Sequence, residues 1–131
     1  MSNRRDTIAI ALGGAIGAIL RVLLGEAMPI GTGMPWATLA CNIFGAGLLG
    51  AIAAAPTRGR FGDLRMPLLG IGFCGGLTTF SALSWELYDL INQGSIALAV
   101  AYAGLSLGLG MAALSLMRRV ALDRESSEAC Q

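Results

Sequence analysis

Histidine is absent from this sequence of 131 residues, and all nine of its cationic side chains are arginine. Without histidine, the chain has no Ser-His-Asp or Cys-His nucleophile and no histidine-ligated zinc or haem. Its three cysteines are odd in number and far apart, so they form neither a disulfide framework nor a CxxC metal pair. The carboxylates Glu86 and Asp89 stand three residues apart, and we expect solvated charges at a helix end rather than an acid–base pair. An enzyme is therefore not expected.

Charge is also scarce, because charged residues make up 13 % of the chain and apolar residues 55 %. A soluble domain carries about 25 % charged residues, so this composition indicates a membrane protein. The net charge of +1 gives no basic footprint for nucleic acid. Glycine, in contrast, occurs 19 times. Small-xxx-small pairs inside the apolar runs predict closely packed helices, at Gly13/Gly17, Ala46/Gly50, Gly72/Gly76 and Gly104/Gly108.

Four uncharged stretches of 14, 31, 20 and 28 residues lie between the charged residues. A bilayer core about 30 Å thick is crossed by about 20 helical residues, whose backbone groups must pair within their own segment. We therefore predict an all-α membrane protein, a single four-helix domain over residues 1–131 with spans at about 7–24, 35–55, 66–90 and 95–117. Residues 121–131 are expected to be a frayed cytoplasmic tail. A cleaved signal peptide is the alternative for the first span, although no small-x-small site precedes Arg21.

Arginine is distributed unevenly between the two sides of the predicted bundle. The N-terminus, the second loop and the C-terminal tail hold eight arginines, all on one side of a four-span chain, and the other side has at most Arg21. Because loops rich in arginine stay in the cytoplasm, both termini are predicted to be cytoplasmic in a multi-pass protein of the inner (plasma) membrane. A chain that inserts in both orientations has nearly balanced flanks, so this bias favours a fixed orientation.

The third span combines a glycine cluster with hydroxyl residues at its centre. Each glycine costs about 1 kcal/mol of helix propensity relative to alanine, and threonine or serine caps a new helix. We predict that two half-helices meet at Gly75–Thr79, at the middle of the bilayer. Carbonyl groups of the first half would hold a cation there, and amide groups of the second half would favour an anion. A glycine-rich helix that packs closely without a break is the alternative.

Three motifs in this chain resemble the CrcB/Fluc fluoride channel family, and they occur in the same order. The strongest is Gly75-Gly76-Leu77-Thr78-Thr79-Phe80-Ser81, with Glu86 a few residues later. The first span carries Gly13-Gly14-x-x-Gly17-x-x-x-Arg21. The second span carries Trp36-Ala37-Thr38-Leu39-x-x-Asn42-x-x-Gly45, close to the GTL-x-x-N-x-x-G pattern of the family. The resemblance covers nearly the whole chain.

The resemblance implies a fluoride-specific ion channel that passively exports fluoride down its electrochemical gradient, lowers cytoplasmic fluoride and confers fluoride resistance. It implies an antiparallel (inverted) dimer with dual topology and two pores along the interface. A structural sodium ion at the dimer centre would be held by backbone carbonyls of Gly75 and Thr78 from both subunits. The implied partners are fluoride, the lipid bilayer, and a second copy or a paralogous subunit in inverted orientation.

The resemblance also implies the residues of the anion pore. Asn42 falls on the pore asparagine, and Phe80 falls on the first of two pore phenylalanines, whereas Leu83 replaces the second. Arg21 resembles the first-span arginine. Hydroxyl groups that can face the pore belong to Thr79, Ser81, Ser84, Tyr102 and Ser106. The carboxyl group that follows the motif belongs to Glu86. The side chains themselves leave alternatives open: an interhelical hydrogen bond for Asn42, ordinary packing for Phe80, and an interface anchor for Arg21.

Two other functions are compatible with a chain of this kind. A small proton-coupled multidrug exporter is also a four-span dimer, but it needs a membrane-embedded carboxylate, and the first span has none. A non-conducting partner subunit of a heterodimeric fluoride channel is the second possibility. It is suggested by Leu83 and by Gly110, which stands where the family tends to place a further hydroxyl.

Overall fold

Helices make up almost all of the structure, a computed structural model that describes residues 4–28, 33–55 and 59–129. Four segments are long and apolar enough to cross a membrane, and no strand occurs within the described ranges. The four candidate spans are Arg4–Ala27, Trp36–Ala54, Gly62–Asn92 and Ile96–Arg124. The predicted all-α membrane fold with four spans is therefore confirmed.

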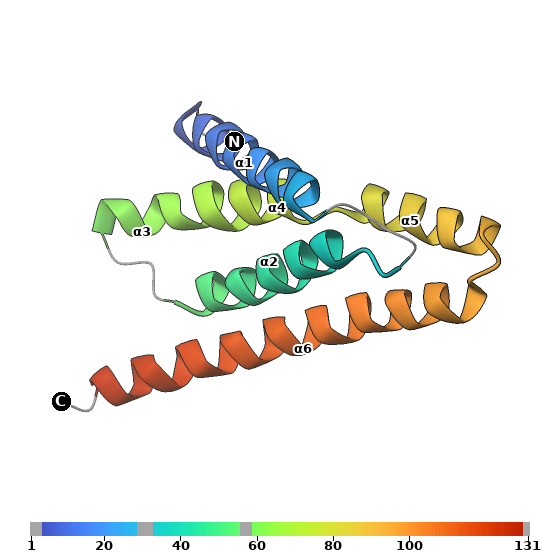
Figure 1. Ribbon diagram of the computed structural model, residues 1–131. Helices are drawn as coiled ribbons and strands as arrows, with labels where there is room; N and C mark the ends of the chain where they lie inside the picture. The colour runs from blue at the N-terminus through green and yellow to red at the C-terminus, as the bar shows by residue number, and fades with distance from the viewer. Residues whose placement is uncertain (1–3, 29–32, 56–58, 130–131) are drawn as a thin grey trace.

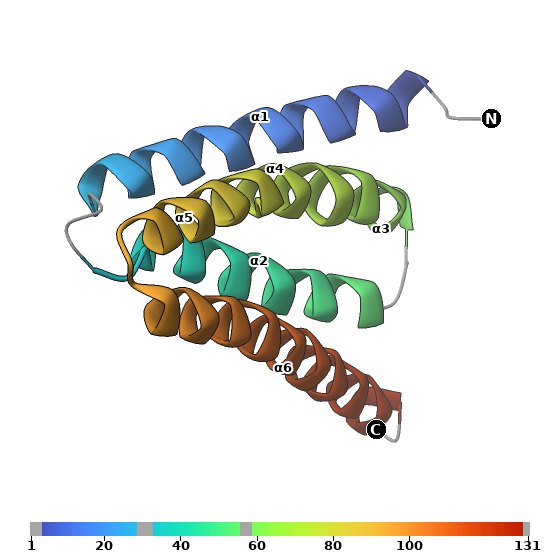
Figure 2. The ribbon, with the colours of Figure 1, turned by 90° about the vertical axis from the view of Figure 1, so that its right-hand side faces the viewer.

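The four spans stack side by side in an order that differs from their order in the chain. Helix α1 (Arg4–Ala27) packs against the third span, and α2 (Trp36–Ala54) packs between the third span and α6 (Ile96–Ala129). Figure 2 shows this order from top to bottom. It also shows the N-terminal end of α1, helix α3 and the C-terminal end of α6 at one end, with the C-terminal end of α1, the start of α2 and the α5–α6 connection at the other.

The third span is interrupted near its middle. Helix α3 (Gly59–Arg65) continues into a wider π-helical stretch, η1 (Met66–Cys74), and then into one α-helical turn, α4 (Gly75–Leu77). Thr78 and Thr79 are extended, with ψ angles of 152° and 127°, and α5 (Phe80–Asn92) begins after them. The predicted interruption is therefore present, but it is confined to the two threonines, and the helix runs through Gly75 and Gly76 without a break.

The glycines of this region instead let two backbones touch. A Cβ atom at Gly13 would lie 1.9 Å from the carbonyl oxygen of Leu68, and one at Gly76 would lie 2.2 Å from that of Gly14. Such distances leave no room for any side chain between α1 and the third span. The pair Gly104/Gly108 differs, because nothing lies within 4 Å of a Cβ at either position. The close packing predicted for that pair does not form within one subunit.

Helix α6 is longer than the fourth span predicted from the sequence. It continues to Ala129, so residues 121–129 are helical where a frayed tail was expected. No glycine or proline follows Gly110 in this helix. Opposite charges at i, i+4, such as Arg119 and Asp123, also favour its continuation.

Replacing Gly13 by alanine tests the contact between α1 and the third span. We expect Gly13→Ala to lower the free energy of unfolding by about 1–3 kcal/mol, because the new methyl group meets a backbone oxygen that cannot rotate away. Gly25→Ala is the matched control on the same helix, since nothing lies within 4 Å of a Cβ there. Thermal unfolding of the purified protein in detergent measures both variants, and equal stability of the two would contradict this packing.

Candidate functional site

An open groove of about 480 Å³ lies beside the interruption of the third span. Residues from α2, α4, α5 and α6 line it, together with both extended threonines. Seven of the predicted site residues are among them: Asn42, Gly75, Thr78, Thr79, Phe80, Leu83 and Ser106. Gly110, which stands where the family tends to place a further hydroxyl, also lines the groove, and the other lining residues, Ala46, Leu107 and Met111, are apolar and were not predicted. The interruption thus places polar groups along an apolar groove at mid-span.

Asn42 is bonded to the interrupted backbone through both ends of its amide. Its Nδ2 donates to the carbonyl oxygen of Thr79 at 3.2 Å, and its Oδ1 accepts from the amide of Thr79 at 2.8 Å. Asn42 therefore makes an interhelical hydrogen bond and also lines the groove. Because Nδ2 carries two protons, one of them is left over after the bond to Thr79.

The interruption removes the usual donors from the carbonyl groups of Gly75 and Thr78. In a continuous helix these carbonyls would accept from the amides of Thr79 and Ala82. Here Thr79 N donates to Asn42, and Ala82 N donates to the Thr79 hydroxyl at 3.2 Å. The carbonyl of Gly76, between them, accepts from Arg21 Nε at 3.2 Å. Arg21 thus binds the end of α4, whereas the amides that would normally donate to the carbonyls of Gly75 and Thr78 are bonded elsewhere.

The first residues of α5 present the opposite kind of polar group. Thr79 caps this helix with its hydroxyl, as the sequence predicted for a threonine or serine, and it lies 3.1 Å from the Ser81 hydroxyl. Among the described residues, the backbone amides of Phe80 and Ser81 have no backbone acceptor in α4. The N-terminus of a helix carries partial positive charge, so this end of α5 favours an anion. The side chain of Phe80 is 78 % exposed, which makes it the most exposed large apolar residue of the described chain.

Glu86 is buried, which corrects the expectation of a solvated charge at a helix end. Its two carboxyl oxygens accept from the Thr38 hydroxyl at 2.6 Å and from the Tyr102 hydroxyl at 2.5 Å. Glu86 is 8 % exposed and Tyr102 is fully buried, whereas Asp89 is exposed and accepts from Gln93. Thr38 was not among the predicted site residues, although its position one helical turn before Asn42 on a polar face of the second span was a usable signal.

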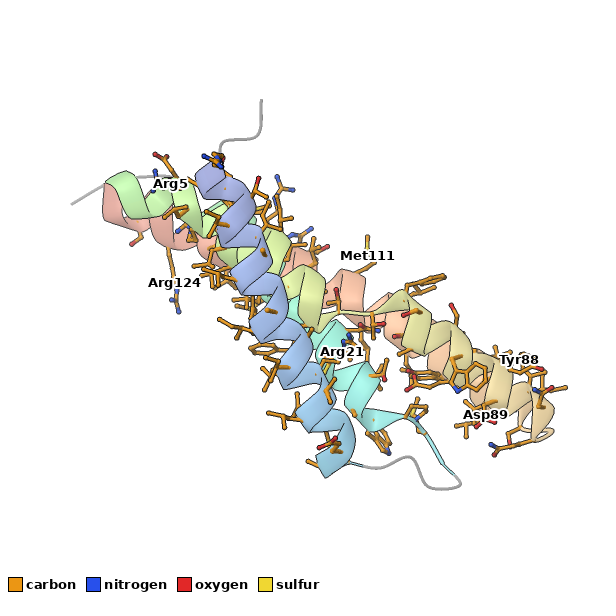
Figure 3. The ribbon with its side chains drawn as sticks, turned by 90° about the horizontal axis from the view of Figure 1, so that it is seen from above. Arg5, Arg21, Tyr88, Asp89, Met111 and Arg124 are labelled. Carbon is orange, nitrogen blue, oxygen red and sulfur yellow. The ribbon has the colours of Figure 1, made fainter. Side chains whose placement is uncertain are left out.

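Several predicted pore residues lie outside the lining of the groove. Ser84 donates to the carbonyl oxygen of Phe80 at 2.9 Å and is exposed, as is Ser81. Tyr102 is held by Glu86, and Arg21 is held by Gly76. Figure 3 shows Arg21 midway along the molecule, with Met111 near the same level. The groove and the buried hydrogen bonds of Glu86 with Thr38 and Tyr102 therefore lie next to each other along α5 and α6.

Comparisons with known proteins agree on one family. Residues 8–117 match the family described as CrcB-like protein, Camphor Resistance (CrcB). The protein named Fluoride-specific ion channel FluC 1 from Mycobacterium bovis is 40 % identical over 126 residues, covering 92 % of this chain and 96 % of the relative. The Deinococcus radiodurans protein named Fluoride-specific ion channel FluC is 44 % identical over 107 residues, covering 79 % and 85 %. The Erythrobacter litoralis protein of the same name is 41 % identical over 116 residues, covering 82 % and 85 %.

The two tyrosines of the chain allow a matched test of the buried cluster. Tyr102→Phe removes one of two hydroxyl donors from the Glu86 carboxyl group, so we expect a loss of about 1–3 kcal/mol in the free energy of unfolding. Tyr88→Phe is the control, because Tyr88 is 59 % exposed and its ring stays beside Trp85. Thermal unfolding in detergent compares the two variants. Equal melting temperatures would show that the Tyr102 hydroxyl does not stabilise the bundle.

Proposed function

The chain belongs to the CrcB family, and on that premise we propose that it forms a fluoride channel rather than an enzyme. The relatives named above are fluoride-specific ion channels and align with most of this chain. The channel lets fluoride leave the cytoplasm down its electrochemical gradient and so confers resistance to fluoride. Hydrogen fluoride enters cells as a neutral molecule and dissociates inside, so a passive anion pathway is sufficient for export.

The observation that carries this proposal is the groove beside the interrupted third span. Fluoride is small and strongly hydrated, so a pathway must replace its water with hydrogen-bond donors. The groove offers the spare proton of Asn42 and the hydroxyls of Thr79 and Ser106, next to the N-terminus of α5. The exposed ring of Phe80 can present its electropositive edge to the anion. The side chains of the remaining lining residues Ala46, Leu83, Leu107 and Met111 are apolar.

A structural sodium ion fits the carbonyl groups of Gly75 and Thr78. Both residues line the groove, and the amides that would occupy their carbonyls in a continuous helix are bonded elsewhere. Carbonyl oxygens are suitable ligands for a hard cation, and two subunits together would supply four of them. A sodium ion bound there would offset the partial negative charges of these oxygens. It would also link the two subunits, because each supplies two of the carbonyl ligands.

A second subunit in inverted orientation completes the channel. The groove is open on one side in the single chain, and Gly75 and Phe80 are exposed on that side. The interruption lies near the middle of the span Gly62–Asn92, so inversion about an axis in the membrane plane keeps both interruptions at the same depth. The gathering of the arginines at one end supports a plasma-membrane location with both termini of this chain in the cytoplasm.

The proton-coupled exporter is not favoured as an alternative. The burial of Glu86 does provide a carboxyl group inside the span, which the sequence analysis did not expect. However, both of its oxygens are occupied by hydroxyl donors from α2 and α6, so a bulky cationic drug would have to displace Thr38 and Tyr102. The family of the chain supports a channel instead.

Fluoride efflux from proteoliposomes tests the channel. Vesicles that are loaded with fluoride and contain the purified protein should release it rapidly without a proton gradient, as measured with a fluoride electrode, and should retain chloride. Equal release of chloride would overturn the assigned selectivity. A strict dependence of efflux on a proton gradient would favour an exporter.

Two substitutions locate the pathway in the same assay. Asn42→Asp removes a donor and adds negative charge beside the groove, and Phe80→Ile removes the ring edge. Each should lower the fluoride efflux rate by at least about tenfold, a barrier increase of about 1.4 kcal/mol. The matched controls are Asn92→Asp and Phe44→Ile, since both residues are exposed and lie outside the groove. Wild-type rates in Asn42→Asp and Phe80→Ile would place the pathway elsewhere.

Removal of sodium tests the proposed cation site. A bound ion stabilises the folded protein by about 2.7 kcal/mol when its concentration is one hundred times its dissociation constant. We therefore expect the melting temperature to fall when sodium is replaced by N-methyl-D-glucamine at constant ionic strength, and to recover when sodium is restored. A melting curve that does not respond to sodium would contradict the site, and it would leave the fluoride pathway unaffected.

A further inference from the structure

The arginine side chains that flank the spans gather at one end of the bundle. Figure 3 shows Arg5 and Arg124 at this end. The N-terminal end of α1 and the C-terminal end of α6 lie there together with α3. Two adjacent pairs of exposed side chains belong to this end, Arg4 with Arg5 on α1 and Arg118 with Arg119 on α6. Two different spans therefore present positive charge at the same end.

The depth of the pair on α6 follows from the length of the apolar helix before it. Helix α6 carries no charged residue from Ile96 to Met117, a run of 22 residues. At 1.5 Å per residue this run is about 33 Å long, enough to cross a hydrocarbon core about 30 Å thick. The exposed ring of Tyr88 lies at the opposite end of the bundle, as an aromatic side chain at the second membrane interface does. Arg118 and Arg119 come directly after the run, so they lie at the depth of the lipid phosphate groups.

Three of these four arginines have no partner in the part of the chain that the structure describes. Arg4, Arg118 and Arg119 make no hydrogen bond or ion pair there. Arg65 at the same end differs, because its Nη2 donates to the carbonyl oxygen of Ala55 at the end of α2. A guanidinium group binds a phosphate group through two parallel hydrogen bonds. The arginines at the ends of α1 and α6 can therefore take a phosphate from outside the bundle.

Exposed apolar surface continues from both arginine pairs into the spans. Leu116 precedes Arg119 by three residues, and Ile8 follows Arg5 by three, so each lies about one turn deeper on the same helix face. Leu116 is 62 % exposed and Ile8 is 59 % exposed. Neither residue lines the groove beside the interruption. A ligand with a phosphate headgroup and apolar chains matches both the charge and the adjoining face, whereas a free phosphate matches only the charge.

We propose that the arginine pairs on α1 and α6 bind the headgroups of anionic phospholipids such as phosphatidylglycerol. The lipid phosphate pairs with the guanidinium groups, and its acyl chains lie along the faces that contain Ile8 and Leu116. Clusters of arginine at the ends of spans attract anionic lipids, and each arginine near the membrane surface strengthens the attraction. This interaction surface is separate from the groove and does not depend on what the groove conducts.

Arg124 provides a matched control on the same helix. It lies five residues beyond Arg119, which places it about 8 Å further from the bilayer, and the exposed Asp123 precedes it. That distance is about one Debye length at physiological ionic strength. Arg124 and Arg119 are both exposed, so replacing either one by glutamine removes the same charge from the surface of α6.

Titration of the purified protein in detergent with lipid, followed by native mass spectrometry, tests the site. We expect phosphatidylglycerol to bind at least about tenfold more tightly than phosphatidylcholine with the same acyl chains. Arg119→Gln should weaken phosphatidylglycerol binding by about fivefold, and Arg124→Gln by less than about twofold. Arg119→Lys keeps the charge and should retain most of the affinity. Arg4→Gln combined with Arg5→Gln should lower the number of phosphatidylglycerol molecules retained, because it removes the pair on α1.

The same titration gives the results that would overturn the proposal. Equal affinity for the two lipids would remove the preference for an anionic headgroup. Equal losses in Arg119→Gln and Arg124→Gln would mean attraction by net charge without a site at the headgroup level. Displacement of phosphatidylglycerol by an excess of inorganic phosphate would identify a site for free anions and not for lipid. Fluoride efflux is not measured here, so none of these results bears on the proposed function.

Discussion

The two hydrogen bonds between the Asn42 amide and the backbone of Thr79 allow a helix to be interrupted halfway through an apolar bundle. An unpaired backbone group in lipid costs several kcal/mol, so an interruption persists only where a neighbour supplies both a donor and an acceptor. Asn42 supplies both, at 3.2 Å and 2.8 Å. The carbonyls and amides next to this pair thereby lose their usual helical partners, and the proposed ion sites depend on them.

Close backbone contact between α1 and the third span holds that interruption in place. Gly13 and Gly76 allow the two helices to touch, and Arg21 reaches from α1 to the carbonyl of Gly76. The second anchor lies beyond the interruption, where Glu86 links α5 to α2 and α6 through Thr38 and Tyr102. The half-helices before and after the interruption are thus each fixed to different neighbours, which keeps their freed ends apart.

The single chain leaves the groove beside the interruption open on one side. The exposed Phe80 ring and the uncovered Gly104/Gly108 face show that contacts within the chain do not use all of the surfaces suited to helix packing. In the proposed channel a second subunit covers this face of the bundle.

Bilayer thickness, flanking charge and helix propensity act on local stretches of chain, so the four spans, the clustering of arginine on one side of the bundle and the region of the interruption could be predicted from the sequence alone. The sequence did not determine that Glu86 is buried, that Thr38 and Tyr102 bind it, or that the break falls at the threonines and not at the glycines. Those outcomes rest on hydrogen bonds between residues 16, 37, 48 and 55 positions apart. Only the packing of α1, α2 and α6 around the third span decides them, because it brings such distant groups within bonding distance.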